Sequence, residues 1–125
     1  MSTLLFAYGT ILRNDIQTQI AGHLSNTFLA RLDGYRVCFG EWPYIVPDNM
    51  AFAPGRVLTD LSEEDILKYD EYEKLRPFSD LEEDRIFERR LTKIIGADGA
   101  RMQSWVYFPV LERWRPEWLE RRAND

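Results

Sequence analysis

Apolar and polar positions along the chain fall into short runs that predict strands, with a few helices between them. Residues 4–8 form an apolar run that stops at the Gly-Thr pair at residues 9–10, as expected for a buried strand that ends in a loop. Residues 87–95 and 102–108 are strand-like runs joined through the Asp-Gly pair at residues 98–99. This arrangement predicts a β-hairpin near the end of the chain.

The middle of the chain is less regular. Residues 27–32 and 35–39 surround an Asp-Gly pair and predict either two strands or one interrupted strand. Residues 42–49 contain two prolines and are interpreted as a loop, because proline fixes φ and removes a donor from a strand ladder. A brief strand is predicted over residues 55–58.

Helix signals occur at three places. Residues 14–22 predict a short helix, and Pro116 is placed to open another near the end of the chain. The clearest helix start is at Ser62, because Asp65 can reach back to complete a capping box and apolar residues flank the pair as a staple. The pattern therefore predicts a single α+β domain over residues 1–125, with mostly antiparallel strand pairing.

Charge and composition narrow the classes of function. Asp and Glu exceed Lys and Arg by 21 to 16, a net charge of −5, which disfavours binding to nucleic acid. We see no apolar run of membrane-spanning length and no signal-peptide pattern, and we therefore expect a cytoplasmic protein that does not bind membranes. One cysteine, Cys38, and one histidine, His23, exclude an internal disulfide and leave no thiolate or imidazole set for a metal. The acidic residues at 80–84 lack the spacing of a calcium loop and indicate a solvated, charged loop over residues 74–86.

One carboxylate occupies an unusual position in the helix that starts at Ser62. The apolar stripe of that helix passes through Ile66 and Tyr69, and the next position on the same stripe is Glu73. Burial disfavours a charged carboxylate, so an inward Glu73 would have a raised pKa and would exchange protons near neutral pH. Glu71 falls on the opposite, solvated side. The pattern makes Glu73 a candidate general acid and base.

A plainer interpretation of Glu73 stays open. The helix can end before residue 73, and the carboxylate then lies at the surface or pairs with Arg85, Arg89 or Arg90. The turn at residues 8–11 is a second candidate site, because glycine after a strand lets successive backbone N–H groups face an anion. Most turns of this kind, however, are only turns.

Several fragments, taken together, carry a family resemblance. In order along the chain they are Phe6-Ala7-Tyr8-Gly9-Thr10, Gly34-Tyr35-Arg36, Gly55-Arg56-Val57, Tyr69-Asp70-Glu71-Tyr72-Glu73, Phe87-Glu88-Arg89-Arg90, Asp98-Gly99 and Ser104-Trp105-Val106-Tyr107. Their succession resembles the gamma-glutamylcyclotransferase-like family, which includes gamma-glutamylamine cyclotransferase and the AIG2-like proteins of plants.

The resemblance implies a small mixed, mostly antiparallel β-barrel with flanking helices. It also implies an enzyme that releases 5-oxoproline from a small γ-glutamyl compound by intramolecular aminolysis, without a metal or other cofactor. Catalysis would fall on Glu73, in agreement with the helical phase. Substrate binding would fall on Tyr8, Gly9, Thr10 and Ile11.

Two tyrosines, Tyr35 and Tyr107, are further candidates for walls of the substrate pocket, although each is equally well explained as an ordinary half-buried strand residue. The chain also departs from the family pattern. Lys74 and a charged loop follow Glu73 where the family has glycine and a short link, and Asn14 stands near a position where the family has glycine.

Two other classes of function remain open. The altered rim after Glu73 is compatible with a small-molecule binding module of the same fold that has no turnover. The C-terminal tryptophans suggest an interaction protein, or a homo-oligomer formed through Trp114 and Trp118.

Overall fold

The computed structural model of the chain describes residues 3–74 and 85–121. The charged loop predicted after Glu73 lies largely outside these ranges, as does the acidic run at 80–84. The elements, in chain order, are β1 (Thr3–Ala7), a 3₁₀ turn η1 (Thr10–Leu12), α1 (Asn14–Ala21), β2 (Thr27–Phe39), β3 (Pro43–Leu61), α2 (Glu63–Lys74), β4 (Phe87–Gly96), β5 (Arg101–Pro109) and the 3₁₀ turns η3 (Leu111–Arg113) and η4 (Pro116–Trp118).

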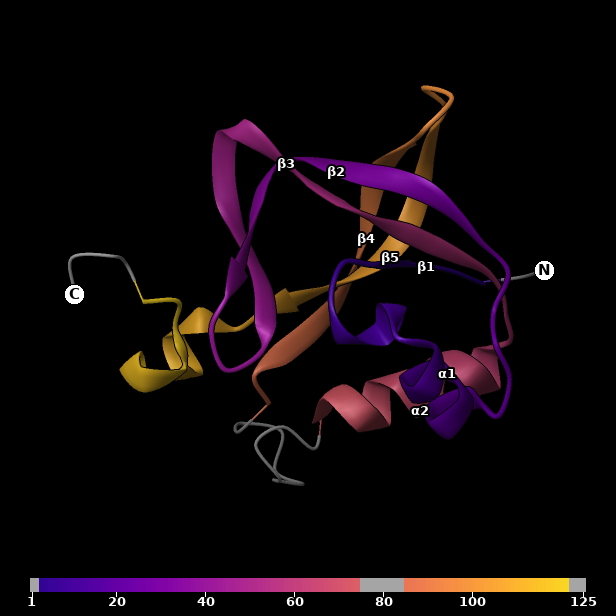
Figure 1. The fold of residues 1–125 in the computed structure, drawn as a ribbon, viewed down its shortest axis with the longest axis horizontal. Coiled ribbons are helices and arrows are strands. Elements are labelled where there is room, and N and C mark those ends of the chain that lie inside the picture. Colours follow the sequence, from indigo (N-terminus) through magenta and orange to yellow (C-terminus); the bar gives the residue numbers. More distant parts are fainter. Residues whose placement is uncertain (1–2, 75–84, 122–125) are drawn as a thin grey trace.

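The five strands close into a barrel in the order β1-β3-β2-β4-β5. Four of the pairings are antiparallel, and β5 closes the barrel by pairing with β1 in parallel. Figure 1 shows α1 and α2 side by side against one end of the barrel, while the β2–β3 hairpin extends away from it. The predicted α+β class and the mixed, mostly antiparallel barrel with flanking helices are confirmed.

The interpretation of residues 42–49 as a loop was wrong. Residues 43–49 belong to β3, which runs from Pro43 to Leu61 and pairs with β2 as a long ribbon, whereas residue 42 lies in the bend before it. The part of β3 before residue 55 pairs with β2 only, so its prolines lie on a strand edge, where a missing N–H is tolerated. The interrupted strand predicted over residues 27–39 is one strand, β2, whose register shifts at Gly34, where φ is +84°.

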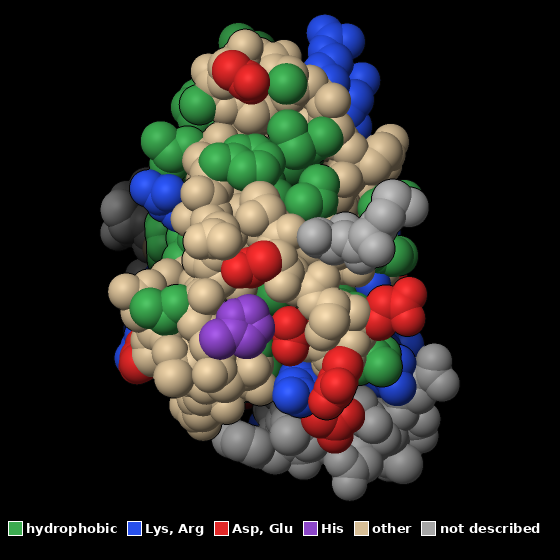
Figure 2. Space-filling model, turned by 90° about the vertical axis from the view of Figure 1, so that its right-hand side faces the viewer, with side chains coloured by type: hydrophobic (Ala, Val, Ile, Leu, Met, Phe, Trp, Pro, Cys, Tyr) green, Lys and Arg blue, Asp and Glu red, His purple; other side chains and the backbone are tan. Residues whose placement is uncertain are grey.

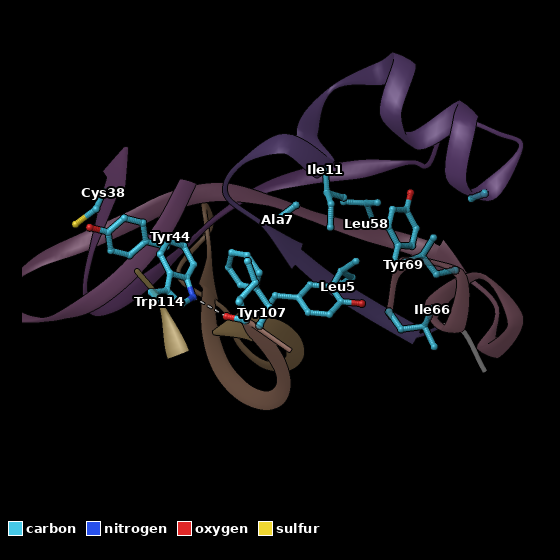
Figure 3. Close-up of a cluster of buried hydrophobic side chains, with 14 residues drawn as sticks. Leu5, Ala7, Ile11, Cys38, Tyr44, Leu58, Ile66, Tyr69, Tyr107 and Trp114 are labelled. Atoms are coloured by element: carbon cyan, nitrogen blue, oxygen red, sulfur yellow. Dashed lines mark hydrogen bonds between the residues drawn. The ribbon is translucent and has the colours of Figure 1, made fainter. Parts of the chain in front are cut away.

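Side chains on the strands alternate between two apolar clusters. One cluster lies inside the barrel and includes Phe6, Val57 and Val106. The other lies on the outer face, where Leu5 and Tyr107 meet residues of the helices. Figure 3 shows the outer cluster running from Tyr44 and Trp114 at one end, past Leu5 and Ala7, to Tyr69 and Ile66 of α2 at the other. This outer cluster fixes α2 against β1 and β5.

The capping box predicted at the start of α2 is confirmed. The Ser62 N–H donates to Asp65 Oδ2 at 3.2 Å, and the Asp65 N–H donates to Ser62 Oγ at 3.0 Å. Leu61 and Ile66, on either side of the cap, are both buried in the outer cluster. The helix therefore starts at a fixed place, and this sets the direction of every later side chain on it.

The same cap binds the histidine. His23 Nε2 lies 3.1 Å from Asp65 Oδ2, and Figure 2 shows the histidine beside acidic side chains on the surface. The hydrogen bond to Asp65, followed by the contact with the Leu24 carbonyl, raises the pKa of His23. Protonated His23 therefore ties the loop after α1 to the first turn of α2.

We expect this tie to stabilise the fold at low pH only. A raised pKa in the folded state contributes stability that is complete below the unfolded value, about 6.5, and is lost as the pH rises through the folded value. Urea unfolding of the wild type and His23→Gln should show the wild type slightly more stable at pH 5.5 to 6, and the two equal near pH 8.5. The effect is small because solvent screens this exposed pair. A difference that grows with pH would contradict the assignment.

The C-terminal tryptophans pack within the chain. Trp114 is 7% exposed, its Nε1–H donates to the Ile86 carbonyl at 2.9 Å, and its ring meets those of Tyr44 and Phe87 at centroid distances of 4.8 and 5.5 Å. Trp118 packs against Trp42 at 5.3 Å. The ring of Trp114 is thus buried in its own chain, and an oligomer formed through the C-terminal tryptophans stays a prediction.

Candidate active site

A narrow pocket opens where β1 ends, between the η1 loop and α2. Its cavity volume is about 30 Å³. Its floor and walls come from three strands, β1, β4 and β5, together with the loop after β1, the start of β3 and the last turns of α2. The residues that line it are Phe6, Ala7, Tyr8, Gly9, Thr10, Ile11, Pro43, Glu73, Phe87 and Tyr107.

Glu73 is the acidic side chain of this pocket. The α2 helix continues to Lys74, and Glu73 is 7% exposed, so the predicted inward direction is confirmed and the surface alternative is wrong. Burial, and then the nearby charge of Asp70, raises the pKa of Glu73 to about 8. A carboxyl group with such a pKa can hold or release a proton at neutral pH.

A hydrogen-bonded network lies beside Glu73. The Tyr107 hydroxyl donates to Asp70 Oδ1 at 2.6 Å, and Arg89 donates to both oxygens of Asp70 at 2.8 and 2.9 Å. The guanidinium also stacks 4.1 Å above the ring of Trp105. The Tyr8 hydroxyl donates to the main-chain carbonyl of Tyr107 at 2.7 Å. The network connects α2, β4 and β5 to the end of β1.

The two tyrosine hydroxyls keep their protons. Burial, and then the charge of Glu73, raises the pKa of Tyr8 well above its usual value. Burial, the hydrogen bond to Asp70 and the charges of Asp70 and Glu73 likewise raise the pKa of Tyr107. At neutral pH both hydroxyls are neutral, so Glu73 is the group among these three that titrates in the physiological range.

The structure brings most of the predicted site residues together. Tyr107, Glu73 and the whole loop predicted to bind substrate line one pocket, although their roles in chemistry stay predictions. Tyr35 is not a wall of this pocket. It follows the register shift of β2, and its ring packs edge-on against Phe108 at 5.4 Å, beside the cluster inside the barrel.

Sequence reasoning missed several residues of the site. Asp70 was quoted only as part of a motif, yet it lies one helical turn before Glu73 and binds Tyr107. The i, i+3 spacing of the two carboxylates on one helix was a signal that could have found it. Pro43 and Phe87 also line the pocket, and nothing in their local sequence indicated this.

The loop at Gly9 is packed against the start of β3. A Cβ atom at Gly9 would lie 2.8 Å from Pro43 Cβ, closer than real Cβ atoms come, and 3.1 Å from Pro43 Cγ, which is also tight. The absence of a side chain at Gly9 thus lets the loop lie against Pro43. The 3₁₀ turn that follows makes its first bonds from Leu12 to Gly9 and from Arg13 to Thr10, which leaves the amides of Thr10 and Ile11 without acceptors inside the turn.

We expect Gly9→Ala to distort this loop. The added methyl group forces the loop or Pro43 to move, at a cost of about 1–3 kcal/mol in the free energy of unfolding. The double variant Gly9→Ala/Pro43→Gly removes the clashing atoms. It should recover part of the function that Gly9→Ala loses, measured with the assay given under Proposed function. Single and double variants that lose function equally would contradict a steric cause.

The described part of the chain contains no cluster of three or more His, Cys, Asp or Glu side chains that could hold a metal ion. Within the same ranges, no helix is both long and apolar enough to cross a membrane.

The fold and the pocket define a class, namely a small closed-barrel protein with a buried, titratable carboxyl group at a narrow pocket. Residues 5–121 match the family described as gamma-glutamyl cyclotransferase, AIG2-like, and the chain belongs to this family. A search of curated proteins finds no match.

Solved structures show the same fold at low sequence identity. A solution structure from Arabidopsis thaliana is 19% identical with a TM-score of 0.75, covering 98% of this chain and 77% of its own. A structure described as gamma-glutamyl cyclotransferase is 16% identical with a TM-score of 0.70. The match covers 86% of this chain and 66% of the chain of that structure. An uncharacterised human protein is 17% identical with a TM-score of 0.69 and the same coverage.

Proposed function

We propose that this protein is a γ-glutamyl cyclotransferase that releases 5-oxoproline from a small γ-glutamyl compound. The observation that carries the proposal is the buried Glu73, with a pKa of about 8, at the wall of a pocket shared with the loop after β1. Membership in the family supports the same reaction class.

In the proposed reaction the free α-amine of the γ-glutamyl group attacks its own γ-carbonyl. A carbon–nitrogen bond forms to close the five-membered ring, and the bond from the carbonyl carbon to the leaving nitrogen breaks. The pocket contributes by holding the substrate curled, because proximity and orientation lower the entropic barrier of ring closure.

Glu73 would move the protons of this reaction. The substrate's ammonium favours the ionised form of the neighbouring carboxyl, so Glu73 can take one proton from the attacking nitrogen. Glu73 would deliver that proton to the leaving nitrogen as its bond breaks and take the second proton from the ring nitrogen, which keeps one hydrogen as an amide. The second proton then passes to the released amine or to solvent, which returns Glu73 to its starting state. The amides of Thr10 and Ile11, which have no acceptors inside η1, would bind a substrate oxygen.

The test is a panel of γ-glutamyl amino acids and γ-glutamyl amines, each with a free and with an acetylated α-amine. Purified protein should release 5-oxoproline from at least one free-amine compound and from no acetylated one. Release from an acetylated compound would refute the mechanism. Binding without product from any free-amine compound would favour a binding module of the same fold.

A further inference from the structure

Gln17 of α1 is a buried polar side chain that the proposed mechanism does not use. It is 3% exposed, and Ala21, one turn further along α1, is buried on the same face of the helix. Among the described residues, the buried polar and charged side chains are Gln17, Glu73 and Ser104. Burying an amide is costly unless it is hydrogen-bonded, so the partners of Gln17 indicate why a glutamine stands there.

Both ends of the Gln17 amide are bonded to the main chain. Its Nε2 donates to the carbonyl of Ile11 at 2.9 Å, and its Oε1 accepts the N–H of Ser25 at 3.1 Å. The side chain at this position must therefore donate to one group and accept from another, which an amide does and an ionised carboxylate cannot do. The first bond reaches the loop after β1, and the second reaches the loop after α1.

The bond to Ile11 holds one wall of the pocket. Within η1, the carbonyls of the two residues before Ile11 accept main-chain N–H groups, whereas the Ile11 carbonyl accepts the side chain of Gln17. Arg13, between η1 and α1, has an extended backbone with ψ of 131°, so the turn does not continue into the helix. Gln17 joins the two across this break. Ile11 lines the pocket, and Figure 3 shows it beside Leu58 in the outer cluster.

We propose that Gln17 is a positioning residue of the pocket, whose side-chain amide anchors the loop after β1 at Ile11 and so fixes that wall relative to Glu73. This inference rests on the proposed function and adds the residue that holds the loop predicted to bind substrate. The cavity volume is only about 30 Å³, so a shift of the loop by about 1 Å changes what the pocket can hold. Pro43 packs against the other end of the same loop at Gly9, so the loop is held from both ends.

Gln17→Met tests the anchor, because it removes both hydrogen bonds and keeps the length of the side chain. The loop contacts substrate before and during ring closure, so its displacement should raise KM for the best substrate of the panel by about 10-fold or more and change kcat far less. A merely structural role would instead lower the fraction of folded protein, which reduces the apparent kcat and leaves KM unchanged. An unchanged KM in Gln17→Met would overturn the inference. Gln19→Met is the matched control, because Gln19 is exposed on the same helix, and this variant should keep the wild-type KM.

Gln17→Glu separates the two hydrogen bonds. A protonated glutamate can still donate to Ile11 and accept from Ser25, whereas the ionised form only accepts and turns a negative charge toward the Ile11 carbonyl. The ratio of the KM of the variant to that of the wild type should be near one at pH 5.5 and rise with pH. Titration of Glu73 is common to both proteins and cancels from this ratio. A ratio that is already high at pH 5.5, or that falls with pH, would overturn the role of the bond to Ile11, and this variant decides the question should Gln17→Met fail to fold.

The loop itself reports the anchor without turnover. In two-dimensional NMR spectra of Gln17→Met, the amide signals of Gly9 and Thr10 should shift or broaden, whereas that of Val57, buried inside the barrel, should stay in place. Wild-type turnover together with unchanged loop signals in the variant overturns this inference alone. Absence of 5-oxoproline from the wild type overturns the proposed function, and altered loop signals in Gln17→Met then still support the anchor.

Discussion

Glu73→Gln is expected to lower 5-oxoproline release by a factor of about 10²–10⁴, the usual contribution of a general acid and base. Glutamine keeps the shape of the side chain and its hydrogen-bonding capacity, but it cannot exchange a proton. Steady-state rates with the best substrate of the panel give the measurement. Glu71→Gln is the matched control, because Glu71 is exposed on the other side of the same helix and its loss should leave the rate nearly unchanged.

The same substitution should stabilise the fold at high pH. Burial raises the pKa of Glu73 from 4.5 to about 8, so the folded state favours the protonated form. The protonated carboxyl therefore contributes stability that is complete below pH 4.5 and is lost as the pH rises through about 8. Glutamine never becomes charged and loses no stability in this way. Urea unfolding should therefore show Glu73→Gln more stable than the wild type above pH 8. The assignment of Glu73 would be contradicted by a Glu73→Gln variant that releases 5-oxoproline at the wild-type rate. It would also be contradicted by a variant that is less stable than the wild type at high pH.

Trp114→Ala is expected to cost about 3–5 kcal/mol of unfolding free energy, the usual loss for a large buried aromatic. Domains of this size are stable by only about 5–15 kcal/mol, so the variant should be close to unfolding at 37 °C. The loss arises because Trp114 is the ring that joins Trp42, Tyr44, Phe87 and Trp118. Chemical unfolding monitored by circular dichroism measures it.

A milder substitution separates packing from hydrogen bonding. Trp114→Phe removes the indole N–H, yet the Ile86 carbonyl still accepts the N–H of Val110 at 2.8 Å, so the cost should be only about 1 kcal/mol. A loss as large as that of Trp114→Ala would show that the hydrogen bond, and not the ring, holds the cluster together.

Wild type and Trp118→Ala should sediment with the same mass, because Trp118 packs within its own chain.

Local signals in the sequence predicted the parts of the fold that local physics determines. The capping box at Ser62 and Asp65 fixed the start of α2, and the 3.6-residue period then placed Glu73 inward. The hairpin at Asp98-Gly99 was equally local, because Gly99 adopts the positive φ of 85° that such turns require. Each of these predictions depended on residues a few positions apart.

Features that depend on strand pairing between distant parts of the chain could not be predicted from local signals. Residues 42–49 have the composition of a loop, yet residues 43–47 are extended because they pair with β2. The position of Tyr35 depended on the register shift at Gly34, and the Asp-Gly pair signalled an interruption there without fixing the new pairing partner of Tyr35. The closed barrel itself was implied by the family resemblance and not by the hydrophobic pattern, which supports many antiparallel arrangements.

The parallel pairing of β1 with β5 has a consequence for how the molecule folds. Strands β2 to β5 can form an antiparallel sheet of four strands from connections along that part of the chain, but β1 must close the barrel between β3 and β5. The Tyr8–Tyr107 hydrogen bond spans 99 positions of sequence, and contacts of such separation form late because the loop-closure entropy must be overcome first. We therefore expect the pocket to be the last part of the molecule to assemble. A partly folded chain that already gives the circular dichroism spectrum of its sheet would still be inactive, and recovery of activity on refolding would lag behind recovery of secondary structure.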